Sequence, residues 1–139
     1  MGHSVCCKLQ WTAAHRLINY TGPCAMLHGH FWTAEIHLAA SLNPAGMSVD
    51  FSVIKKDLGG WIDKYWDHGT LVSANDKSLL RWLRANKQKH YCFSNPTAEV
   101  LSVSLYEKAR ELFGSTRVLV SGVTVSESPK NSASFWSGV

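Results

Sequence analysis

The chain of 139 residues is 45% hydrophobic and 17% charged, a composition that supports a buried core and excludes a largely disordered protein. Its length fits one domain, residues 1–139. The net charge of +4 suits an anionic small molecule, whereas the scattered Lys and Arg residues argue against nucleic acid as a partner. Residues 1–10 lack signal-peptide features and no apolar stretch reaches the roughly 18 residues of a membrane span, so we expect a cytoplasmic protein without a membrane partner.

Two extended segments open the chain. Residues 4–14 are typical of a strand, and a loop containing Gly22 and Pro23 follows it. Residues 30–40 alternate strictly between two sets of side chains, which predicts a half-buried strand. One set is Phe31, Thr33, Glu35 and His37, and the other is Trp32, Ala34, Ile36 and Leu38.

Three helices are expected next. Apolar residues at helical spacing predict a helix over residues 50–65, although the Gly59–Gly60 pair weakens it. A shorter helix is expected over residues 76–88, with Asn75 or Asp76 as its N-cap. A third begins after Asn95-Pro96, with Thr97 as the cap, and ends at Gly114.

The chain closes with β-rich segments at residues 117–127 and 134–136. The resulting order is ββααββ with one additional short helix. Two strand pairs that flank helices predict an α+β domain in which an antiparallel four-stranded sheet carries its helices on one face.

The densest chemical signal is His28-Gly29-His30. Residues i and i+2 of an extended chain point to the same side, so both imidazoles can reach one ion. If the first two strands pair as a hairpin, His15 at the end of the first strand joins them. Three neutral imidazoles suit Zn²⁺ and leave a fourth position open. The alternative is that these are ordinary loop histidines.

Cys24 lies four residues before His28. It can be a fourth zinc ligand, which closes the site, or a free thiol that the nearby cation converts to a thiolate. The spacing does not separate these two interpretations. In a reducing compartment Cys6, Cys7 and Cys92 are expected as thiols too.

Other candidate residues end helices or strands. Asp67-His68 can move a proton near neutral pH, or it can be a polar helix terminus. Glu127 ends an apolar strand, where it can accept two N–H bonds from a flat heterocycle or lie as a charge on the surface. Glu99 can contact a ligand, or it can be an acid in the first turn of a helix, where its negative charge interacts favourably with the helix dipole.

Taken together, these residues resemble the 6-pyruvoyl-tetrahydropterin synthase family of the tunnelling fold. The matching strings run in order from about residue 9 to residue 136. They are Thr12-Ala-Ala-His-Arg-Leu17, Cys24-Ala-Met-Leu-His-Gly-His-Phe31, Gly46-Met-Ser-Val-Asp-Phe51, Asp67-His68, Asn95-Pro-Thr-Ala-Glu-Val-Leu101 and Val123-Thr-Val-Ser-Glu127. The spacing of three residues between Cys24 and His28 resembles that of the QueD-type 6-carboxy-5,6,7,8-tetrahydropterin synthases of queuosine (7-deazapurine) synthesis.

The resemblance implies a carbon–carbon lyase. It would convert 7,8-dihydroneopterin triphosphate to 6-carboxy-5,6,7,8-tetrahydropterin, acetaldehyde and triphosphate. It also implies a homo-oligomer, commonly a hexamer, with active sites between subunits. The alternatives are pyruvoyl-type synthesis from the same substrate and a zinc-stabilised oligomeric binding module without catalysis.

The family's roles fall on matching positions of this sequence. By resemblance, His15, His28 and His30 are zinc ligands, Cys24 is the proton-abstracting thiolate, and Asp67 with His68 forms a proton relay. The pterin ring is held by Glu127, with the helix start at Thr97, Ala98 and Glu99.

Some features depart from the family or stay unassigned. About fourteen residues, roughly 74–91, lie where short members have none, and Leu71-Val72 replaces a usual Leu-Asn. The triphosphate-binding residues are not assigned. Arg16 is the nearest candidate, but on a regular strand it points away from His15.

Overall fold

The computed structural model describes residues 2–138. Its centre is an antiparallel hairpin of two long strands, β1 (His3–His15) and β2 (His28–Ala40). Their register runs without a break from His3 opposite Ala40 to His15 opposite His28. The predicted strands 4–14 and 30–40 are therefore confirmed, each slightly longer than expected.

The closing strands extend the sheet beside β2. Strand β5 (Val118–Ser128) pairs antiparallel with β2, and β6 (Asn131–Trp136) pairs antiparallel with β5. Both β-rich segments expected at the end of the chain are thus strands, and the last begins earlier than the predicted residue 134.

The predicted strand count and the purely antiparallel arrangement are wrong. Among residues 2–138 the sheet has six strands, in the order β4-β3-β1-β2-β5-β6. Strand β3 (Gly69–Ser73) runs parallel to the end of β1, and β4 (His90–Phe93) runs parallel to β3. Both strands are short, so neither shows enough alternation to be recognised locally, and their pairing depends on the free edge of β1.

The helix expected over residues 50–65 is present but not uniform. It consists of α1 (Phe51–Ile54), a π-helical turn η2 (Lys55–Gly59) and α2 (Gly60–Tyr65). Asp50 starts it by accepting a hydrogen bond from Ser52 N. The wider turn ends at Gly59, where the sequence predicted a weak point.

The other two helices have the predicted caps. Helix α3 (Lys77–Ala85) begins at Asp76, and helix α4 (Ala98–Phe113) begins at Thr97, whose hydroxyl accepts from Val100 N. Helix α4 ends at Gly114 as expected, whereas α3 ends before the predicted residue 88.

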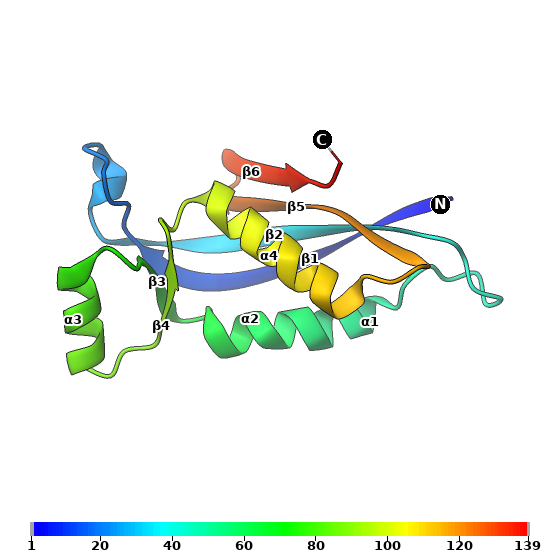
Figure 1. The fold of residues 1–139 in the computed structure, drawn as a ribbon, viewed down its shortest axis with the longest axis horizontal. Coiled ribbons are helices and arrows are strands. Elements are labelled where there is room, and N and C mark those ends of the chain that lie inside the picture. Colours follow the sequence, from blue (N-terminus) through cyan, green and yellow to red (C-terminus); the bar gives the residue numbers. More distant parts are fainter. Residues whose placement is uncertain (1, 139) are drawn as a thin grey trace.

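Two of the helical segments cover one face of the sheet, as predicted. Figure 1 shows α4 (yellow) across the long strands and α1–α2 (green) beside it, and α4 contacts both β5 and η2. The core between these layers includes the fully buried indoles of Trp11, Trp32 and Trp66. Helix α3 lies at the end of the molecule and packs through a separate small cluster on Val72 of β3.

A short 3-10 helix, η1 (Pro23–Ala25), lies in the loop between β1 and β2. Within residues 2–138, no helix combines the length and apolar character that crossing a membrane requires.

Candidate metal centre and active site

Three histidines converge where β1 ends and β2 begins. His15 is paired directly with His28, and His30 lies two residues further along β2 on the same side. The ring centroids are 4.6 Å apart for His15 and His28, 4.7 Å for His28 and His30, and 5.2 Å for His15 and His30. One nitrogen from each ring lies within 4.8 Å of the other two.

Backbone carbonyl groups fix two of the three rings. His15 Nδ1 donates to Pro96 O at 2.7 Å, and His28 Nδ1 donates to Met26 O at 2.6 Å. A carbonyl oxygen only accepts, so Nδ1 carries the proton in both rings. The lone pair of the neutral imidazole is then on Nε2, the atom that faces the other histidines. The Nε2 atoms of His15 and His28 are 3.1 Å apart.

His30 presents its Nε2 atom to Glu127. This atom is buried and has no hydrogen-bond partner in the described part of the chain, and it lies 3.6 Å from Oε2 of Glu127. Glu127 continues the buried side of β5 after Val123 and Val125, and a register irregularity against β6 falls between Ser126 and Ser128. A bulge of this kind directs a side chain, and here the carboxylate is directed toward the histidine cluster.

Burial favours the neutral form of two of the histidines, His15 and His30. Desolvation lowers the pKa of His15 to about 4, although its hydrogen bond to Pro96 opposes the shift. Burial also lowers the pKa of His30, against the opposing attraction of Glu127. Neutral imidazoles are the form that binds a metal ion, so the lowered pKa values of His15 and His30 are compatible with metal binding near neutral pH.

The donor set fits Zn²⁺. Tetrahedral coordination with Zn–N bonds of about 2.0–2.1 Å requires ligand nitrogens about 3.3 Å apart, close to the separation of the His15 and His28 Nε2 atoms. His30 offers the third ring nitrogen. Three imidazoles would leave a fourth coordination position of such an ion open.

Cys24 is in η1, within the loop that joins two of the histidines. It is a free, half-buried thiol, and the group of converging ligand atoms consists of the three histidines without it. The carbonyl group of Cys24 accepts from Leu17 N at 2.9 Å, which joins the two arms of the loop. The Cys24 thiol therefore lies outside the group of converging histidine nitrogens.

Asp67 and His68 form a hydrogen-bonded pair just before β3. His68 Nδ1 donates to Asp67 Oδ2 at 2.8 Å, and Asp67 Oδ1 accepts from Thr12 N at 2.9 Å. Burial raises the pKa of Asp67, but the hydrogen bonds from Thr12 and His68 outweigh it, and the pKa lies below its ordinary value. The His68 side chain is 80% exposed. Within residues 2–138 the hydrogen bonds of this pair do not reach the three histidines.

The segment just before α4 contacts the histidine cluster, because the carbonyl oxygen of Pro96 accepts a hydrogen bond from His15. Thr97 is used as the helix cap, Ala98 is half-buried in the helix, and Glu99 is exposed. Glu99 lines a surface hollow of about 420 Å³ along α4 rather than the histidine cluster. The sequence marked Asn95-Pro96 only as a helix start, and no local signal identified the Pro96 carbonyl group as a support of His15.

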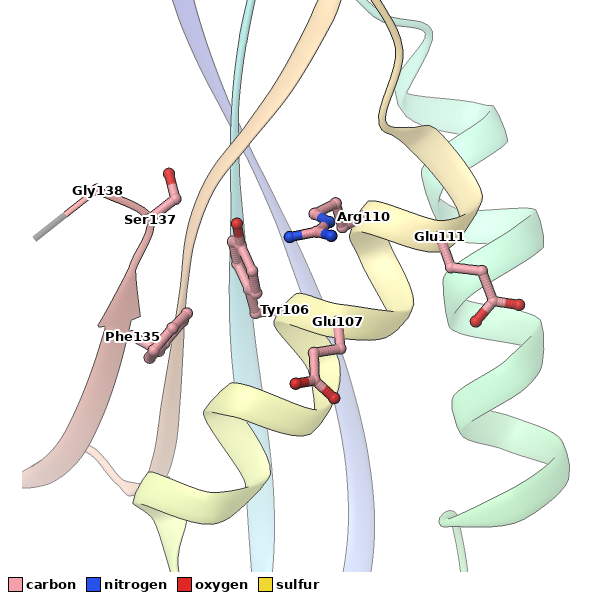
Figure 2. A pocket seen from close by; sticks show the side chains of 7 residues that line it. All are labelled: Tyr106, Glu107, Arg110, Glu111, Phe135, Ser137 and Gly138. Atoms are coloured by element: carbon pink, nitrogen blue, oxygen red, sulfur yellow. The ribbon is translucent and has the colours of Figure 1, made fainter.

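Another hollow, of about 530 Å³, lies between α4 and β6. Figure 2 shows Arg110 and Glu107 of the helix around it, with Tyr106 facing Phe135 of the strand. None of the residues predicted for chemistry lines it, so it is separate from the candidate active site.

Fold and site together define an α+β protein with three converging histidines, which could hold a metal ion, on the helix-covered side of its sheet. The comparisons with known proteins give the family. The model of 6-pyruvoyl tetrahydropterin synthase matches residues 4–138, and the chain belongs to this family. The resemblance found in the sequence is thereby confirmed.

Two bacterial proteins of the same name are similar to this chain in sequence. A protein of Rickettsia bellii named 6-carboxy-5,6,7,8-tetrahydropterin synthase is 32% identical over 126 residues, 88% of this chain and 91% of the relative. A protein of the same name from Synechocystis is 28% identical over 109 residues, 75% of this chain and 72% of the relative.

Solved structures share the fold. The 6-pyruvoyl tetrahydropterin synthase of Caenorhabditis elegans superposes with a TM-score of 0.72 at 21% identity, over 98% of this chain and 96% of its own. An uncharacterized protein from Wolinella succinogenes superposes with a TM-score of 0.83 at 20% identity, over 97% and 98% of the two chains. The predicted α+β class is confirmed by these neighbours.

Proposed function

We propose that this chain is a zinc-dependent 6-carboxy-5,6,7,8-tetrahydropterin synthase. It converts 7,8-dihydroneopterin triphosphate to 6-carboxy-5,6,7,8-tetrahydropterin and releases acetaldehyde and triphosphate. The observation that carries the proposal is the convergence of His15, His28 and His30 beside Glu127. The names of the relatives from Rickettsia and Synechocystis support the choice of product.

In this proposal the Nε2 atoms of the three histidines hold Zn²⁺. The ion, when bound, stabilises negative charge on the hydroxyl oxygens of the substrate side chain. Glu127 accepts two N–H bonds from the aminopyrimidinone edge of the pterin, in the bidentate manner of a carboxylate. The first turn of α4, from Thr97 to Glu99, supports the ring from a neighbouring position.

The remaining residues move protons. Cys24, as a thiolate, removes a proton bound to carbon in the substrate side chain, which requires a base held within hydrogen-bond reach. Asp67 keeps the Nδ1 proton of His68 engaged, so that the exposed Nε2 atom of His68 exchanges protons with the reaction. Such a pair near neutral pH suits a reaction that shifts protons between adjacent carbons.

The exposure of His68, and the absence of a hydrogen bond from its side chain to the three histidines among residues 2–138, support an active site completed between subunits. We propose a homo-oligomer, a hexamer by resemblance, in which one subunit supplies the metal centre and its neighbour supplies Asp67 and His68. The proposed place of the reaction is queuosine (7-deazapurine) synthesis in the cytoplasm.

The product assay tests the proposal. Zinc-loaded protein is incubated with 7,8-dihydroneopterin triphosphate, pterins are separated by chromatography with mass detection, and acetaldehyde is measured by its enzymatic reduction. We expect equal amounts of acetaldehyde and 6-carboxy-tetrahydropterin. A pyruvoyl-pterin without acetaldehyde would indicate the other synthase activity of the family. An intact substrate with zinc-loaded, oligomeric protein would indicate a non-catalytic binding module.

A further inference from the structure

The segment that leaves the metal centre, residues 15–18, is held at every position. His15 donates to Pro96 O, and Leu17 N donates to Cys24 O. Ile18 exchanges two hydrogen bonds with the amide side chain of Asn95, at 3.2 and 3.1 Å. The remaining position, Arg16, has the strongest connection.

Arg16 forms a two-point ion pair with Asp76. Its Nε donates to Oδ2 at 2.6 Å and its Nη2 donates to Oδ1 at 2.7 Å. The Asp76 side chain is only 6% exposed and that of Arg16 is 30% exposed. A bidentate arginine–carboxylate pair fixes direction as well as distance, so it restrains the backbone beside His15.

Asp76 belongs to the additional segment, roughly residues 74–91, that the proposed chemistry does not use. The same carboxylate starts α3, because its Oδ1 accepts from Leu79 N at 3.3 Å. Helix α3 is anchored in turn on Val72 of β3 by a buried apolar cluster. The pair therefore joins the loop of Cys24 to a helix that packs on β3, the strand beside β1 in the sheet.

The loop needs such an anchor. Cys24 lies nine residues after the end of β1, and Leu17 N to Cys24 O is the hydrogen bond between the two arms of the loop. Leu17 directly follows Arg16, so movement of Arg16 moves the donor of that bond. His15, by contrast, is also held by strand pairing with His28 and Leu71.

We propose that Arg16 and Asp76 are positioning residues, and that their ion pair makes helix α3 a brace that holds Cys24 in place beside the metal centre. In this arrangement Arg16 is occupied by the protein itself rather than by a substrate phosphate. The brace itself is a property of the chain's own geometry, and only its effect on turnover rests on the proposed function.

The experiment measures the reactivity of Cys24 directly. Zinc-loaded protein is treated with iodoacetamide and the alkylation rate of each cysteine-containing peptide is followed by mass spectrometry. In Arg16→Met we expect Cys24 to react about tenfold faster, since loss of a charge-assisted hydrogen bond frees the loop to open. Cys6, exposed on β1, is the internal control and keeps its rate.

Three further variants separate bracing from general stability. Asp76→Asn keeps the cap of α3 but loses the charge, and we expect the same increase for Cys24. The double variant should match the single ones, because both remove one interaction. Arg81→Met removes an exposed arginine of the same helix and should change nothing.

Unchanged reactivity of Cys24 in Arg16→Met and Asp76→Asn, additive effects in the double variant, or an equal increase for Cys6 would each overturn the brace. Turnover gives the second readout: we expect kcat to fall about tenfold or more with KM and zinc content unchanged, as a misplaced base predicts. Faster alkylation with unaltered kcat would leave the brace standing and contradict the role proposed for Cys24.

Discussion

The Nε2 atoms of His15 and His28 lie 3.1 Å apart, although each ring already donates its Nδ1 proton to a backbone carbonyl oxygen. In the neutral rings two lone pairs therefore face each other, and His30 adds a third nitrogen without a partner. A cation bound between them relieves this repulsion, which makes the arrangement costly when empty and favourable when filled.

This relationship predicts that zinc stabilises the folded protein. A chelator should lower the melting temperature, and added Zn²⁺ should restore it. At a hundredfold excess of free Zn²⁺ over Kd, the free energy of unfolding should rise by about 2.7 kcal/mol. His28→Ala should lose this response and bind far less zinc per chain, as measured by calorimetry and elemental analysis. His3→Ala, at an exposed histidine outside the cluster, should retain both, and zinc content unaffected by His28→Ala would contradict the centre.

The two interpretations of Cys24 give opposite results in Cys24→Ala. We expect the zinc content to remain and turnover to fall at least about a hundredfold, as for a removed acid–base group. Elemental analysis and the product assay on one preparation measure both quantities. Cys6→Ala is the matched control, because Cys6 is an exposed thiol on β1. Zinc lost together with turnover would identify Cys24 as a structural ligand.

Metal-free protein should lose stability in mild acid because of His15. Its pKa is about 4 when folded and near 6.5 when unfolded, so the unfolded chain binds more protons between these values. Stability from this residue is complete above the unfolded pKa and is lost as the pH falls toward 4. We expect a loss of about 2 kcal/mol between pH 7 and pH 5.

Urea unfolding at several pH values measures this loss. His15→Gln provides the comparison, because the amide does not titrate and still offers a donor to Pro96 O. The variant should show a correspondingly flatter dependence on pH. Parallel curves for the two proteins would show that His15 keeps an ordinary pKa.

The glycine pair in the long helix offers a test of local packing. A Cβ atom at Gly60 would meet no atom within 4 Å, and its backbone is helical, with φ of −62°. Gly60→Ala should therefore stabilise the protein by about 0.5–1 kcal/mol. Gly69→Ala is the contrasting variant, because its Cβ would lie 3.2 Å from Trp66 O and should destabilise. Thermal unfolding compares the two, and a destabilised Gly60→Ala would contradict this account.

Local patterns predicted most elements and their ends. Alternation along residues 30–40 gave both the strand and its buried side, with Trp32, Ala34, Ile36 and Leu38 facing the core. The predicted cap Thr97 was correct, and of the two predicted alternatives Asn75 and Asp76 the structure uses Asp76. Capping is predictable because it depends on a side chain and an N–H group a few residues apart. The histidine pair of β2 was visible for the same reason, since alternation in a strand is local.

Features that depend on contacts between distant segments were decided only by the tertiary structure. The short strands β3 and β4 exist because they pair with the free edge of β1, which no window of sequence contains. The support of His15 by Pro96 O, and of Arg16 by Asp76, joins residues 81 and 60 positions apart. The sequence by itself determined which side chains this protein offers for chemistry, because residue type and strand periodicity are local. The folded chain decided which of them meet, because meeting depends on pairing between distant segments.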